Sequence, residues 1–170
     1  MSEVIATAKE KGLSHELLIA TYYEAHIAMA YQEDPIDSST AHLEAILPLL
    51  NEADQAVCHS ILAHMYSGFK VHYSLAEEER QRKEAMHREA ALANAAMLQK
   101  TDIEPYIHLC RSNGDKNFFS LPPTLYDMLM REEIAMTDNA RTIYDLLKQL
   151  ADFHKNDNDY IRIYIDKELL

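Results

Sequence analysis

The sequence of 170 residues is poor in the features that build tight turns, disulfide frameworks and membrane spans. Glycine occupies only 3 positions, which leaves few sites for the hairpin turns of a β-rich fold. No apolar run reaches the roughly 18 residues of a transmembrane helix. The only cysteines, Cys58 and Cys110, form no disulfide framework. These absences favour an all-α domain that does not insert into a membrane.

Positive charge is also scarce. The chain has 16 basic against 28 acidic residues, a net charge of −12. An acidic surface repels phosphate backbones and anionic lipids, so nucleic acid and membrane surfaces are disfavoured as partners. The one basic run, 80–83, lies beside Glu77, Glu78, Glu79 and Glu84. We interpret it as a solvated helix face with ion pairs three and four residues apart.

Helical periodicity is the strongest positive signal, and it is clearest in segment 56–73. Large apolar residues recur there every four positions, at Val57, Ile61, Met65 and Phe69. Leu62, Tyr66 and Tyr73 widen this stripe beyond a narrow seam. Because so broad an apolar surface needs partners on more than one side, the segment is predicted to be the central helix.

Local signals place the other helices. Gly12 suits the left-handed position after a first helix, Ser14 can cap the second, and Pro48 should end or kink the third. Ser74-x-x-Glu77 has the pattern of a capping box, and segment 111–120 has the composition of a long loop. Helices are expected at about 4–11, 15–31, 75–99, 123–136, 138–155 and 158–169, with a short helix or turn after Thr101. The third helix follows the capping oxygens of residues 37–40 and has Leu43, Ile46, Leu47 and Leu50 on its inner face.

A short internal echo suggests a repeat architecture. Ile19-Ala20-x-x-Tyr23 reappears as Leu62-Ala63-x-x-Tyr66, and a large, a small and then an aromatic residue suit close helix pairing. The prediction is one all-α domain over residues 1–170. It has about seven or eight helices in an irregular antiparallel array that resembles tetratricopeptide (TPR) proteins and the α–α superhelix.

Catalytic and metal-binding patterns are weak. The chain has no Gly-rich phosphate loop, and Cys58 and His59 point about 100° apart on a helix, so they form no catalytic pair. Glu84-x-x-His87 is half of a di-iron pattern, but no second Glu-x-x-His occurs. His64 and His72 share a face and are too few for a site. We predict no enzyme activity, no cofactor and no metal, and we place Glu84 and His87 on a solvated face.

Tyrosine offers the best candidates for a binding surface. Tyr22, Tyr23, Tyr66 and Tyr73 fall on or beside the apolar stripes of two predicted helices. Tyrosine is common both in the cores of helical stacks and in peptide-binding grooves. Both interpretations stay open for these four residues.

Four segments resemble the N-terminal helical region of large bacterial alpha-2-macroglobulin-family proteins. They are 56–66 (AVCHSILAHMY), 101–106 (TDIEPY), 121–129 (LPPTLYDML) and 146–154 (LLKQLADFH). The resemblance implies a non-enzymatic scaffold or protein-interaction module from a longer chain that traps proteases at the periplasm or cell envelope. The family's β-sandwich domains and thioester are missing here, since Gln follows neither cysteine at the third position.

Two other hypotheses remain. The first is a free-standing, TPR-like adaptor that binds a partner peptide in the cytoplasm, which is the compartment expected if the chain is complete as given. The second is a small ferritin-like enzyme, which predicts inward carboxylates around Glu84 and His87. For the envelope module the partner is the rest of the parent chain or another protein. For the adaptor it is a separate protein.

Overall fold

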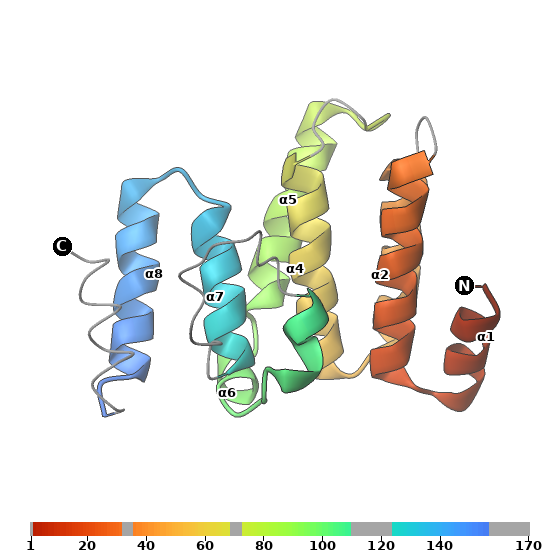
Figure 1. Cartoon of the computed structure of the whole chain (residues 1–170). Coiled ribbons are helices and arrows are strands. Elements are labelled where there is room, and N and C mark those ends of the chain that lie inside the picture. Colours follow the sequence, from red (N-terminus) through yellow and green to blue (C-terminus); the bar gives the residue numbers. More distant parts are fainter. Residues whose placement is uncertain (1, 32–35, 69–72, 110–123, 157–170) are drawn as a thin grey trace.

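The computed structural model describes residues 2–31, 36–68, 73–109 and 124–156, and it is an all-α array of helices (Figure 1). The helices follow one another across the molecule from α1 to α8, and most pack against their neighbours in sequence. Their bounds are α1 Ser2–Lys11, α2 Ser14–Tyr31, α3 Ile36–Ile46, α4 Glu52–Gly68, α5 Glu77–Ala91, α6 Ala95–Leu98, α7 Leu125–Ala135 and α8 Ala140–Phe153. No helix of the described residues could span a membrane.

Helix α4 is the centre of the array, as its apolar surface predicts. It contacts α2, α3, α5 and α7. Val57, Leu62 and Tyr66 are at most 1% exposed, so they pack against several of these neighbours at once. The described part of the helix reaches Gly68, and residues 69–72 of the predicted segment lie outside the described part of the chain.

The boundaries of the first three helices follow from local backbone chemistry. Gly12 has φ +62°, a left-handed conformation that glycine adopts without strain, and it separates α1 from α2. Pro48 cannot continue a regular helix, so α3 stops at Ile46 and a short 3-10 helix, Leu47–Leu49, follows. Both breaks are as predicted.

The predicted capping box at Ser74 is wrong. Helix α5 begins at Glu77 with Ala76 before it, and Ala76 makes no side-chain cap. The hydroxyl and backbone amide of Ser74 instead both donate to the carboxylate of Asp37 on α3. The predicted single helix over 75–99 is also divided. Helix α5 ends at Ala91, and the four-residue α6 follows it.

Helix α5 also carries a buried arginine that supports the end of α4. The Arg80 side chain is 2% exposed, and its guanidinium donates to the backbone carbonyl of Tyr66 in the last turns of α4. Glu77 and Glu84 pair with the same guanidinium at 2.8 and 3.0 Å. The predicted ion pairs are confirmed, but the prediction that the basic run is solvated is wrong at Arg80.

The last two helices have their own caps. Asn139 accepts from the backbone amide of Thr142 at the start of α8, and α7 opens with a capping box between Thr124 and Asp127. A 3-10 helix, Glu104–Leu109, follows Thr101 as predicted. The predicted loop at 111–120 and the predicted helix at 158–169 both lie outside the described residues.

Removing the Thr124 cap should destabilise the protein modestly. We expect Thr124→Ala to lower the free energy of unfolding by about 1 kcal/mol, because the hydroxyl accepts from the Asp127 amide at 3.3 Å and donates to its carboxylate at 2.6 Å. Urea denaturation followed by circular dichroism measures the change. Thr7→Ala, which removes an exposed hydroxyl within α1, is the control and should have a smaller effect.

Candidate functional site

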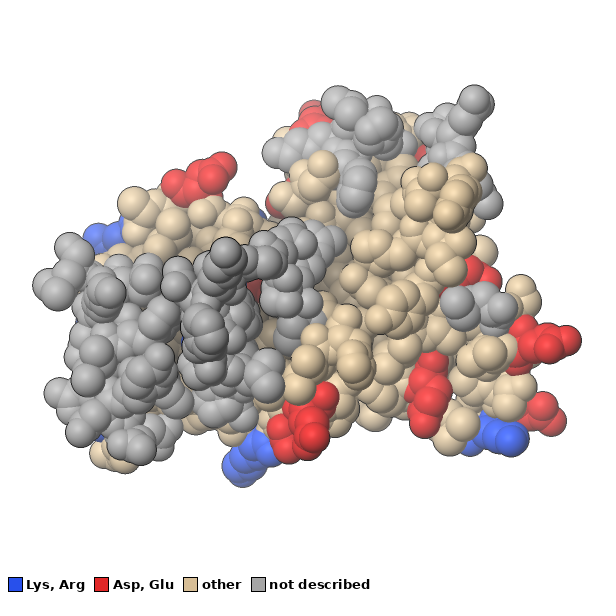
Figure 2. Space-filling view, viewed as in Figure 1, with Lys and Arg blue, Asp and Glu red and all other residues tan. Residues whose placement is uncertain are grey.

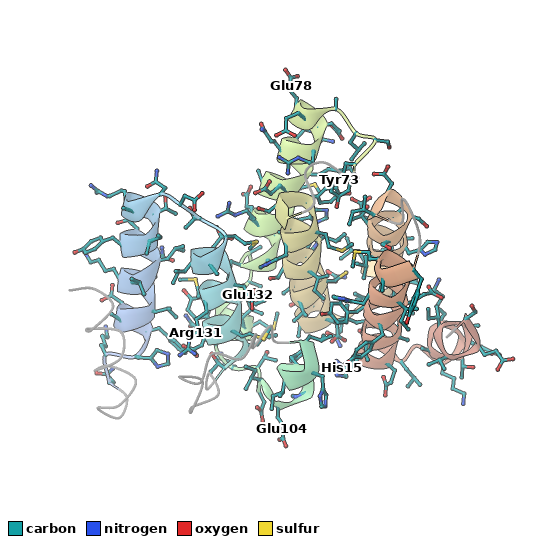
Figure 3. All side chains as sticks on the ribbon, turned by 45° about the horizontal axis from the view of Figure 1, so that its top comes forward. His15, Tyr73, Glu78, Glu104, Arg131 and Glu132 are labelled. Carbon is teal, nitrogen blue, oxygen red and sulfur yellow. The ribbon has the colours of Figure 1, made fainter. Side chains whose placement is uncertain are left out.

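The buried carboxylate of Asp54 joins three parts of the chain. Its side chain is fully buried at the start of α4. Its Oδ2 atom accepts from the Ser14 hydroxyl and, at 2.7 Å, from the side-chain amide of Asn51. Its Oδ1 atom accepts from the Tyr106 hydroxyl at 2.9 Å. Figure 3 shows His15 on α2 beside the 3-10 helix that begins at Glu104. The Nδ1 atom of His15 lies 3.1 Å from Oδ1 of Asp54.

These contacts occupy both oxygens of Asp54, so the group is best explained as a structural junction. Burial is the main cause that raises the pKa of the Tyr106 hydroxyl, and the Asp54 charge adds to it. A tyrosine that keeps its proton stays a hydrogen-bond donor to the carboxylate. The junction therefore holds the start of α2, the start of α4 and the 3-10 helix together at neutral pH.

A second polar cluster links α3, α4 and α5 around Glu44. Lys83 Nζ lies 2.6 and 2.9 Å from the two carboxylate oxygens, and the Tyr66 hydroxyl donates to Oε1 at 2.8 Å. The Lys83 ammonium also lies 5.4 Å from the centre of the Tyr66 ring. Burial opposes the charge of Glu44, but these donors together lower its pKa.

Two histidines extend this cluster into the core. His87 is 1% exposed and stacks on the Tyr66 ring at 5.7 Å, and its Nε2 lies 3.4 Å from Glu44 Oε1. Its Nδ1 lies 2.7 Å from His59 Nδ1 on α4. Two neutral rings satisfy both contacts if His87 donates to Glu44 and accepts from His59. Burial lowers the pKa of both histidines, that of His59 to about 4.

The His59–His87 pair should make the protein less stable in mild acid. The folded state keeps His59 neutral down to about pH 4, whereas an unfolded histidine gains a proton near pH 6.5. The free energy of unfolding should therefore fall by about 1–2 kcal/mol as the pH falls from 7 to 4.5. His59→Gln should flatten this profile, measured by urea denaturation at each pH. His42→Gln on the exposed side of α3 should leave it unchanged.

The structure places the di-iron half-pattern differently from our prediction. His87 is buried rather than solvated, because α4 covers the face of α5 that carries it. Glu84 pairs with Arg80 at 3.0 Å and lies 3.8 Å from Arg88, so two guanidinium groups neutralise it. Among the described residues, no group of three or more His, Cys, Asp and Glu is arranged to hold a metal.

Cys58 is a buried thiol, as predicted. It is 0% exposed, and burial raises its pKa to about 12. A thiol with that pKa carries almost no thiolate at neutral pH and is a poor nucleophile. The residue is best described as part of the packing between α3 and α4, where Sγ lies 3.7 Å from the Leu43 carbonyl oxygen.

A buried histidine–aspartate pair fixes the end of α8 to the start of α7. His154 and Asp127 are 1% and 3% exposed, and His154 Nε2 lies 2.5 Å from Asp127 Oδ1. The hydroxyl of Thr124 donates to the aspartate. This is not the order of a catalytic triad, in which the histidine bridges hydroxyl and carboxylate. The pair serves the α7–α8 packing.

The four tyrosines named from the sequence do not share one surface. Tyr66 is 1% exposed, and Tyr73 is half-buried and stacks on it at 5.0 Å. Tyr22 is half-buried and lines a hollow of about 20 Å³ between α2, α4 and α7, which has room for about one water molecule. Tyr23 is 41% exposed. Only Tyr23 of the four is exposed enough to meet a partner directly.

Helix α2 also carries an exposed apolar surface that our sequence analysis did not single out. We call it the α2 outer stripe. It consists of Tyr23, His26, Ile27, Ala30 and Tyr31, all exposed and none of them formally charged at neutral pH. Ile27 is 51% and Tyr31 85% exposed. The spacing of i, i+3, i+4, i+7 and i+8 in the sequence was the signal that could have found it.

Comparisons with known proteins found no match. No family model, no curated protein and no solved structure matches it. The candidate site therefore depends on the geometry alone.

Proposed function

We propose that the chain is a non-enzymatic helical module that binds another protein through the α2 outer stripe. One observation carries the proposal. Three large hydrophobic side chains, Tyr23, Ile27 and Tyr31, stand exposed at four-residue spacing on one face of one helix. Exposed apolar side chains that are scattered singly need no explanation, whereas a contiguous group indicates an interaction site.

The buried polar groups also support this proposal. The carboxylates of Asp54, Glu44 and Asp127 all have hydrogen-bond partners within the fold. Each of them joins separate helices, which is the work of a rigid scaffold. A rigid scaffold with one apolar helix face suits binding better than chemistry on a small substrate.

The proposal is tested by comparing two matched double variants as baits. Ile27→Ser/Tyr31→Ser removes two large side chains of the outer stripe, and Leu49→Ser/Tyr144→Ser removes one aliphatic and one tyrosine side chain elsewhere, 53% and 50% exposed. Extract of the native cells is passed over wild type and both variants, and retained proteins are quantified by mass spectrometry. We expect a protein that the wild type and the control variant retain and the stripe variant loses.

Equal retention by all three baits, or no specific retention, would contradict the proposal. Circular dichroism of the variants supplies the folding control, since all four substituted side chains are half or more exposed.

Membership of a larger envelope protein of the alpha-2-macroglobulin type stays a prediction of the resemblance, and so does the free-standing TPR-like adaptor. The gene on both sides of this segment distinguishes the two. A long β-rich continuation would favour the module of a larger protein, and native start and stop codons at the ends of this sequence would favour the adaptor.

A further inference from the structure

Helix α2 is apolar on two faces, and the array covers only one of them. Leu17, Leu18 and Ala25 are at most 5% exposed and face α1, α3 and α4. The outer stripe lies on the uncovered side. A helix that is apolar nearly all round is normally buried nearly all round, so α2 is built to have a further neighbour.

The spacing of the outer stripe fits a helix as that neighbour. The stripe runs from Tyr23 to Tyr31, which is about 12 Å along the axis at 1.5 Å per residue. Side chains at i, i+3, i+4, i+7 and i+8 form the ridge that packs into the groove of a second helix. An amphipathic helix laid on such a ridge presents apolar anchors at the same spacing.

The charges around the stripe favour a basic neighbour. Helix α2 contains no Lys or Arg, and its charged residues are Glu16, which is exposed, and Glu24. Glu24 lies 3.9 Å from His42, which is charged only when protonated, and lines a hollow together with Lys9 of α1. In Figure 2 the broad face around α2 is largely uncharged, with acidic side chains along its edges and a few basic ones at its lower right.

A second copy of the chain is the less suitable occupant. Each copy carries a net charge of −12, so two copies repel over the distance at which partners first meet. Two outer stripes placed face to face also contribute no Lys or Arg from either α2. A basic partner meets Glu16 and Glu24 with attraction.

We propose that the outer stripe is the docking site for an amphipathic helix of a partner protein whose apolar seam is flanked by Lys or Arg. This inference rests on the proposed function and adds the chemistry of the partner. The seam covers Tyr23, Ile27 and Tyr31, and the flanking cations meet Glu16 and Glu24. Because charge complementarity acts mainly on the association rate, binding weakens with salt.

The test is selection from a displayed library of stabilised helical peptides with one randomised face, followed by fluorescence anisotropy of the selected peptides. We expect enriched peptides with apolar residues at i, i+3, i+4 and i+7 and flanking Lys or Arg. Their affinity should fall at least about tenfold for Ile27→Ser/Tyr31→Ser and stay unchanged for the matched Leu49→Ser/Tyr144→Ser. Glu16→Gln/Glu24→Gln should weaken binding several-fold at low salt and less at high salt.

Three results would overturn the inference: no enriched peptide, enriched peptides without basic flanks, or equal affinity for the two double variants. Sedimentation velocity tests the alternative that a second copy of the chain occupies the stripe. A wild-type dimer that becomes monomeric in the stripe variant would assign the stripe to that second copy. If the retained protein of the bait experiment depends on the stripe but binds through an acidic or non-helical segment, this inference fails while the proposed function stands.

Discussion

Replacing Asp54 with alanine is expected to cost the protein about 3 kcal/mol of unfolding free energy. The carboxylate is fully buried and accepts from Ser14, Asn51 and Tyr106. Alanine removes the shared acceptor of all three hydrogen bonds, including the one from the buried Tyr106 hydroxyl. The loss of a buried charged acceptor is more costly than the net value of a single neutral hydrogen bond.

Urea denaturation followed by circular dichroism measures this change. Asp54→Asn keeps the size of the side chain and one acceptor oxygen, so it should retain part of the lost stability. Asp145→Ala is the control, because that carboxylate is 53% exposed in a surface pair with Arg141 and should matter little. A loss below about 1 kcal/mol for Asp54→Ala would mean that the junction does not hold the helices together.

Glu44→Ala is expected to lower the free energy of unfolding by about 2–3 kcal/mol. The substitution leaves the half-buried Lys83 ammonium and the Tyr66 hydroxyl without their shared acceptor. Burial opposes the charge of Lys83, and the Glu44 carboxylate no longer offsets this in the variant. Much of the lost free energy of unfolding therefore comes from the unpaired Lys83 ammonium. Urea denaturation at pH 7 supplies the measurement.

A double variant separates the value of the ion pair from the cost of breaking it. Glu44→Leu/Lys83→Leu removes both charges and should recover most of the lost stability, because an apolar pair can replace a buried ion pair at little cost. Glu79→Ala, in an exposed pair with Arg82, should not move the unfolding midpoint. If the double variant were as unstable as Glu44→Ala, packing rather than charge would explain the effect.

The sequence predicted the helices whose ends depend on local chemistry. Gly12 and Pro48 stop their helices through backbone conformation, so their effect does not depend on distant residues. For α8 the sequence predicted a cap at Asp138, but the cap is its neighbour Asn139, which accepts from an amide three residues later. The central position of α4 was predictable as well, because its apolar surface is too broad for one neighbour.

The errors arose where a distant residue competes with a local pattern. Ser74 matches a capping box, but Asp37 accepts both of its donors. Charged neighbours made His87 look solvated, whereas its own face of α5 meets α4. The echo of Tyr23 in Tyr66 does not extend to burial, since Tyr23 is 41% and Tyr66 1% exposed. Sequence spacing identifies a helix face but not what covers it.

The candidate site itself was only partly predictable. Tyr23 was among the residues proposed for a binding surface, and Ile27 and Tyr31 complete its stripe at four-residue spacing. From sequence, this stripe and the one through Leu17 and Leu18 look equally apolar. Which of the two remains uncovered depends on where α1, α3 and α4 pack, and no local pattern carries that information.

The most direct test of the account is to map a bound partner on the surface. The protein that the wild-type bait retains is added to 15N-labelled chain, and amide chemical shifts are followed by NMR. We predict that the largest changes fall at Tyr23, Ile27 and Tyr31 and that α8 is unaffected. Changes confined to α7 and α8, with α2 unchanged, would contradict the claim that α2 presents the binding face.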